Sequence, residues 1–196
     1  MLSALEHGRV ASILKCRPTH VIYSAIRDHV ARVSALNTWG FHDPRYRLEP
    51  DGSVRYDGHF DDEQPARASR FREALRWQSG KSALYRWITA RQRRPTEQDM
   101  RLFIGIVSQA RRLVESAYPG CVFEILFWEK RIQSNDAASA LRKAGFAPRI
   151  VESILPSYHQ DSASYRIPHD GHPTAKANDL LARYVVRSII EGSGRP

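Results

Sequence analysis

The chain has 196 residues, a length that suits one domain with a substantial buried core. Apolar residues make up 42% and charged residues 26% of it, a globular composition rather than that of a disordered chain. The formal net charge of +9 favours an acidic partner, but the basic residues are scattered instead of forming one stripe, so nucleic acid is not the favoured partner.

The cysteine content and the hydropathy pattern narrow the class of protein further. Two cysteines, Cys16 and Cys121, are too few for a disulfide framework, and each precedes an apolar run, which predicts small buried residues. No apolar run reaches the roughly 18 residues that a membrane-spanning helix needs. Glu6, His7 and Arg9 interrupt the first residues before a signal peptide's apolar segment could form, which leaves the cytoplasm as the default expectation.

The first part of the chain predicts a helix followed by a strand. Apolar residues recur on one side of residues 1–14, and Arg17-Pro18-Thr19 then breaks the pattern. Residues 21–26 are short and mostly apolar, as buried parallel strands are. Residues 37–64 differ from this pattern and predict an insertion.

That insertion is rich in Gly, Pro, Asp and aromatic residues. Pro50-Asp51-Gly52 is a turn signal between two short alternating runs, residues 46–48 and 54–56, and it predicts a β-hairpin outside the main sheet.

The remainder alternates between helical and strand patterns. A capping-box pattern at Thr96-Glu97-Gln98-Asp99 opens the strongest helix. The expected elements are helices over 66–77 and 82–92, a helix from Thr96 to Tyr118, a strand from Cys121 to Trp128, a helix ending at Lys143, a strand from Arg149 to Leu155 and a final helix over 174–190. This order predicts an α/β fold with three layers, in which helices cover a parallel sheet.

Ligands of parallel sheets bind beyond the carboxyl ends of the strands. Three polar segments are expected at that edge: Arg27-Asp28-His29, Glu129-Lys130 and Asp170-Gly171-His172. Asp170 and His172 stand two residues apart on a loop between Pro168 and the last helix. A histidine oriented by a carboxylate is the general base of many hydrolases, so this pair is the candidate catalytic site, although an isolated Asp-x-His is common by chance.

These residues carry a resemblance to the SGNH (GDSL-type) hydrolases, a superfamily of esterases, lipases and acetylhydrolases. Asp170-Gly171-His172-Pro173-Thr174 resembles the family's last block, although many members place the Asp three residues before the His. The strand over 21–26 with Arg27-Asp28 resembles the third block, Gly-x-Asn-Asp, with Ala25 at the Gly position and Arg27 at the Asn position. The resemblance implies a flavodoxin-like sheet, Asp170 and His172 as catalytic residues, and Arg27, Asp28 and His29 near the oxyanion or substrate.

The family's nucleophilic serine lies in a Gly-Asp-Ser block after its first strand, and this sequence contains no such block. Asp51-Gly52-Ser53 has the letters in another order and lies in the predicted hairpin turn. Residues 1–6 resemble the helix after the family's second block. We therefore expect an N-terminally incomplete SGNH-like domain over 1–196, in which the strand at 21–26 becomes an exposed apolar edge that favours an oligomer or a partner chain.

Three functions remain open. The first is an ester-hydrolase module whose complete form cleaves acyl groups, such as acetyl, from a small molecule or glycan. The second is a non-catalytic binding subunit that pairs through its open sheet edge, and the third is a basic nucleic-acid-binding protein. His29 could equally cap or pack, and Arg27 could form a surface ion pair. The sequence has neither zinc-ligand spacing nor a Gly-rich phosphate loop, so we expect no metal or cofactor.

Overall fold

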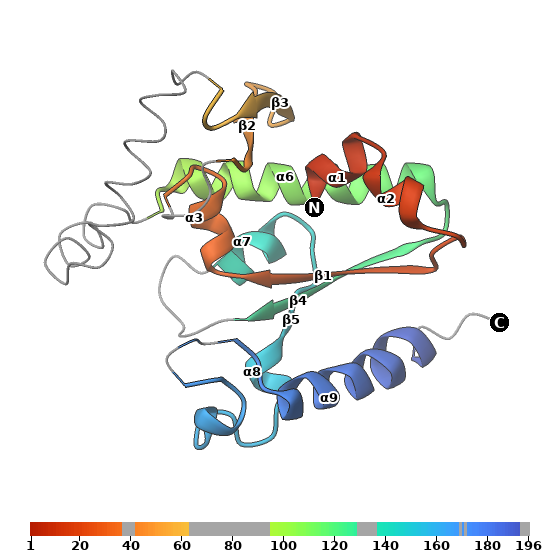
Figure 1. The fold of residues 1–196 in the computed structure, drawn as a ribbon, viewed down its shortest axis with the longest axis vertical. Helices are drawn as coiled ribbons and strands as arrows, with labels where there is room; N and C mark the ends of the chain where they lie inside the picture. Colours follow the sequence, from red (N-terminus) through yellow and green to blue (C-terminus); the bar gives the residue numbers. More distant parts are fainter. Residues whose placement is uncertain (37–41, 63–94, 129–136, 169, 171, 193–196) are drawn as a thin grey trace, which may run out of the picture. The chain divides into compact units, whose positions relative to one another are not determined.

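The computed structural model describes residues 1–36, 42–62, 95–128, 137–168, 170 and 172–192 (Figure 1). The chain forms two compact units. Unit 1 comprises Met1–Thr19 and Arg27–Cys121, and unit 2 comprises His20–Ile26 and Val122–Pro196. The helices expected over 66–77 and 82–92 lie outside the described residues.

Unit 2 contains a parallel three-stranded sheet in the order β1-β4-β5. Strand β1 (His20–Ile26) pairs along its whole length with β4 (Val122–Trp128), from His20 opposite Val122 to Ile26 opposite Trp128. Strand β5 (Arg149–Ile150) pairs with β4 at Leu126 and Phe127. The parallel sheet confirms the α/β class, and among the strands of the described residues β1 is at one end of the order.

Helices cover both faces of this sheet within unit 2. Successive side chains of a strand point to opposite faces, so Phe123 faces away from Leu126. Phe123 contacts Phe146, which follows α7 (Ala137–Lys143), with ring centroids 6.5 Å apart. Leu126 belongs to a core built with α8 (Val151–Ile154), α9 (Ala175–Tyr184) and the π-helical turn η2 (Val185–Glu191). This core contains Leu126, Trp128, Val151, Leu155, Tyr158, Tyr165, Ala177, Leu181 and Ile189.

The strand predicted from Arg149 to Leu155 is wrong beyond its second residue. Val151 begins α8, and Val151, Glu152 and Leu155 are all buried. A strand would send Val151 and Glu152 to opposite faces, whereas positions i, i+1 and i+4 of a helix share one side. The turn to helix therefore buries all three side chains against one core.

Unit 1 is built on α6 (Glu97–Ala117), which packs against α1 (Leu2–Glu6), α3 (Asp28–Arg32) and a β-hairpin. The predicted capping box is present, because Thr96 accepts from the Asp99 N–H and Asp99 accepts from the Thr96 N–H. The predicted hairpin is confirmed as β2 (Pro44–Leu48) and β3 (Val54–His59), an antiparallel pair separate from the main sheet. The core of this unit contains Leu2, Tyr46, Val54 and Ala110.

The single helix predicted over 1–14 is two short helices. Gly8 has φ of +68° and separates α1 from α2 (Arg9–Ile13), because a left-handed residue cannot continue a right-handed helix. The break leaves Ile13 75% exposed. The burial predicted for the cysteines is half correct, since Cys121 is buried but Cys16 is exposed.

Candidate functional site

The loop that carries Asp170 and His172 is closed at its base by a short antiparallel bridge. Arg166 pairs with Pro173, and the Ile167 N–H donates to the His172 carbonyl oxygen at 2.8 Å. One step further out, the Thr174 N–H donates to the Tyr165 carbonyl at 3.1 Å. Backbone bonds on both sides of the bridge thus hold the two ends of the loop together.

The same loop runs directly into helix α9. Thr174 is the N-cap residue, and its hydroxyl accepts from the Ala177 N–H and donates to the Ser164 carbonyl at 2.8 Å. A capping side chain satisfies one of the unpaired N–H groups at a helix start. Thr174 therefore ties the loop both to the helix after it and to the segment before it.

Asp170 and His172 contact each other, as the sequence predicts for a catalytic pair. His172 Nδ1 and Asp170 Oδ1 are hydrogen-bonded, and the side chains are 77% and 49% exposed. When Nδ1 carries the ring proton and donates a hydrogen bond to the carboxylate, Nε2 keeps its lone pair. A contact this exposed adds little to stability, so its chemical value lies in the orientation of the ring.

Arg166 at the loop base enters a cluster of buried side chains. Its guanidinium donates to Glu152 Oε1 at 3.2 Å and, through Nε, to the Tyr158 hydroxyl. The guanidinium carbon lies 5.4 Å from the Trp128 ring centroid and 5.7 Å from that of Tyr158, at cation–π distance. Trp128 is the last residue of β4, so Arg166 packs beside the carboxyl end of that strand.

Arg166 and Glu152 are not part of any motif in the sequence, and neither was expected in the site. One signal was available: Glu152 interrupts the apolar run from Ile150 to Leu155, and a carboxylate in such a run needs a cationic partner once it is buried. The identity of that partner depends on the tertiary fold, because Arg166 lies fourteen residues away.

The other predicted site residues lie in different surroundings. Arg27 and Asp28 are exposed at the start of α3 in unit 1. His29 follows them, and burial, then the nearby charge of Arg32, lowers its pKa from 6.5 to about 4. A neutral, partly buried ring of this kind fits the packing role that the sequence left open for His29. Glu129 and Lys130 lie outside the described residues, and convergence of the three segments remains a prediction.

Three described serines could be considered as nucleophiles in place of the missing block, and Ser164 and Ser53 form local structural hydrogen bonds, whereas Ser24 lies in a strand. The Ser164 hydroxyl donates to Asp161, which caps the 3-10 turn η1 (Ser162–Ser164). Ser24 is exposed in the middle of β1. Asp51 accepts from the Ser53 N–H at 2.9 Å, which is the hydrogen bond of a turn and supports the structural interpretation of that triplet.

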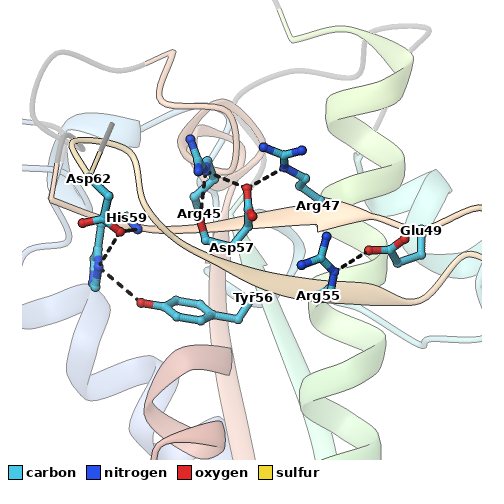
Figure 2. A network of polar contacts seen from close by, with 8 residues as sticks. All are labelled: Arg45, Arg47, Glu49, Arg55, Tyr56, Asp57, His59 and Asp62. Carbon is cyan, nitrogen blue, oxygen red and sulfur yellow. Dashed lines mark hydrogen bonds and ion pairs between the residues drawn. The ribbon is translucent and has the colours of Figure 1, made fainter. Parts of the chain in front are cut away.

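A second polar network covers the hairpin of unit 1 (Figure 2). Asp57 forms ion pairs with Arg45 at 3.0 Å and with Arg47 at 2.5 Å, and Glu49 pairs with Arg55 at 2.8 Å. Burial raises the pKa of Asp57, but the hydrogen bond from Arg47 and the charges of the arginines outweigh it and hold the pKa below its ordinary value. These arginines face carboxylates of the same hairpin, an arrangement unlike the unmatched basic surface of a nucleic-acid-binding protein.

Near the end of β3, His59 continues this network. Its Nδ1 lies 3.2 Å from the Tyr56 hydroxyl, and its backbone N–H donates to Asp62 at 2.5 Å. Nearby in sequence, His42 Nδ1 lies 2.5 Å from Asp61 Oδ2, so unit 1 also carries an exposed His–Asp pair. In the part of the chain that the structure describes, no three His, Cys, Asp or Glu side chains gather as metal ligands would.

Among the described helices, none has the length and hydropathy to cross a membrane. Comparisons with models of protein families, with curated proteins and with solved structures find no match to this chain.

Proposed function

We propose that the chain is the histidine- and aspartate-bearing module of an SGNH-type ester hydrolase. The observation that carries the proposal is the contact between His172 Nδ1 and Asp170 Oδ1 on a loop immediately before the last helix. The parallel order β1-β4-β5 is also the order that the third, fourth and fifth strands of a flavodoxin-like sheet would have.

In this proposal Asp170 accepts a hydrogen bond from Nδ1–H and so holds His172 in the tautomer whose Nε2 is a base. Nε2 takes the proton from a serine hydroxyl as its oxygen attacks the carbonyl carbon of the ester. The imidazolium then gives that proton to the departing alkoxide, which leaves as the alcohol. Water, deprotonated by the same nitrogen, releases the acyl group as a carboxylic acid and restores the serine.

This sequence contains no Gly-Asp-Ser block. The proposed reaction therefore needs a nucleophilic serine from another segment. The edge position of β1 supports pairing with the strand that precedes such a block in a complete hydrolase. The same edge supports the second candidate, a non-catalytic subunit that pairs with another chain and uses the Asp170–His172 pair only to bind.

Hydrolysis of p-nitrophenyl acetate separates the two candidates. Exposed imidazoles catalyse this reaction weakly, so the control is His42→Ala, which removes a second exposed histidine paired with an aspartate, with a His42 side chain 72% exposed. For the hydrolase we expect His172→Ala to lower the protein-dependent rate at least about tenfold, within the range typical of general-base catalysis, and His42→Ala to leave it unchanged. Equal losses in both variants would show generic imidazole catalysis and favour the binding subunit.

A further inference from the structure

We propose that Arg166 is a positioning residue for the Asp170–His172 pair. The proposal deepens the function above and rests on it in taking this pair as the catalytic one. Arg166 does not reach the reacting atoms in this interpretation. It acts by fixing the direction in which the loop leaves the core of unit 2.

Backbone hydrogen bonds anchor the loop at its base, beside Arg166. Arg166 forms the bridge with Pro173, and the hydrogen bond from Ile167 N–H to the His172 carbonyl lies directly inside that bridge. Within the loop, the Asp170 N–H donates to the Ile167 carbonyl at 3.3 Å. A rotation of the backbone at Arg166 would therefore move both members of the pair.

The Arg166 side chain contacts residues of three separate segments. Glu152 is 4% exposed and belongs to α8, Tyr158 belongs to the following segment, and Trp128 ends β4. A planar guanidinium that lies at cation–π distance from two rings and also donates two hydrogen bonds is restricted in orientation more than a flexible ammonium group would be. The guanidinium therefore links the loop to the carboxyl end of β4 and to α8.

The exposed fraction of the side chains rises from Arg166 to the Asp170–His172 pair. The Arg166 side chain is 18% exposed, whereas Asp170 and His172 are 49% and 77% exposed. Side chains this exposed gain little orientation from packing, so the geometry of the pair depends on the backbone that presents it. Arg166, the largely buried residue of this segment, is therefore where the course of that backbone is fixed.

The test compares Arg166→Lys and Tyr158→Phe with a matched control. Arg166→Lys keeps a charge beside Glu152 but loses the planar fork, and Tyr158→Phe keeps the ring and removes only the hydroxyl that accepts from Nε. Arg183→Lys is the control, because Arg183 pairs with Asp179 at 3.0 Å on the same unit with both side chains exposed. The readout is the tautomer of His172 in the full chain, from long-range proton–nitrogen spectra of the neutral imidazole, with the signal assigned by its loss in His172→Gln.

We expect mainly the Nδ1–H tautomer in the wild-type chain and in Arg183→Lys. In Arg166→Lys its population should fall by about half, toward that of a free imidazole, and Tyr158→Phe should shift it in the same direction by less. A purely structural role would lower the unfolding midpoint and leave the tautomer of the folded protein unchanged, and that result would overturn the proposal. If Arg166→Lys does not fold, Tyr158→Phe decides by the same criterion.

The spectra do not depend on ester hydrolysis. If the tautomer population changes in Arg166→Lys but the rate of ester hydrolysis is unchanged in His172→Ala, Arg166 is a positioning residue and the proposed reaction is wrong. An unresponsive tautomer with hydrolysis that depends on His172 would show the reverse.

Discussion

Glu124 on β4 and Arg149 on β5 form an ion pair across neighbouring parallel strands, with Nε and Oε2 3.1 Å apart. Arg149 lies opposite Leu126 in the register, so Glu124, two residues earlier, shares its face of the sheet. Arg149 also donates to the Tyr184 hydroxyl of α9 at 3.0 Å. The hydrogen bond to Glu124 is the main reason that the pKa of Arg149 is raised.

This pair predicts a measurable loss of stability in Glu124→Gln. β5 pairs through only two residues, so side-chain contacts at its start contribute much of its attachment. Glu124 is 18% exposed and Arg149 34%, and we expect the variant to lower the free energy of unfolding by about 1 kcal/mol in urea denaturation. Asp179→Asn, at an exposed pair on α9, should change it by only a few tenths. Equal effects at the two pairs would contradict the assigned role of Glu124.

Gly105→Ala tests the packing of α6 on the hairpin. A Cβ at Gly105 would lie 2.6 Å from Val54 Cγ1 and 3.4 Å from Leu48 Cδ1, inside the core of unit 1. The gain in helix propensity is about 1 kcal/mol. A contact of 2.6 Å forces core atoms to move, which places the cost in the upper part of the roughly 1–3 kcal/mol typical of overpacking, so we expect net destabilisation. Ser116→Ala on the exposed surface of α6 is the control and should be neutral or slightly stabilising. The midpoints of denaturant unfolding measure the two effects. A Gly105→Ala chain more stable than the wild type would show that Val54 and Leu48 can move aside at little cost.

His29 predicts a stability that falls in mild acid. Its pKa is about 4 in the folded chain and 6.5 as its ordinary value, so the unfolded chain binds the proton first as the pH drops. The contribution is fully present above pH 6.5 and is lost as the pH falls toward about 4. Allowing for the ring's partial exposure, we expect a loss of about 1–2 kcal/mol that is absent in His29→Gln. Thermal melts between these two pH values measure it, and identical pH slopes in both chains would contradict the shift.

The order β1-β4-β5 predicts self-association. An apolar parallel strand at a sheet edge is a template for pairing with another chain. We expect light scattering coupled to gel filtration to show concentration-dependent species larger than a monomer, in high salt as well as low, because pairing of backbone groups and apolar contacts survives screening. A monodisperse monomer that melts cooperatively at all concentrations would count against an available edge.

Local sequence patterns predicted those elements whose structure depends mainly on residues close in the sequence. The capping box at Thr96, the turn at Pro50-Asp51-Gly52 and the apolar run of β4 depend on neighbours in the sequence, and all three are present. The contact between Asp170 and His172 also belongs here, since two residues of separation bring the side chains within reach. Gly8 was a local signal too, and its left-handed conformation explains why one expected helix became two.

The α/β class, the hairpin and a His–Asp pair ahead of the last helix follow from the residues alone, because hydrophobic period, turn chemistry and short spacing act within a few residues. The folded chain was needed to show that β5 ends after two residues, that Glu152 pairs with Arg166, and that Arg166 lies over Trp128 at the end of β4. The reason is physical: a buried charge or ring is stable only with partners from distant segments, and the sequence does not state which segments will meet.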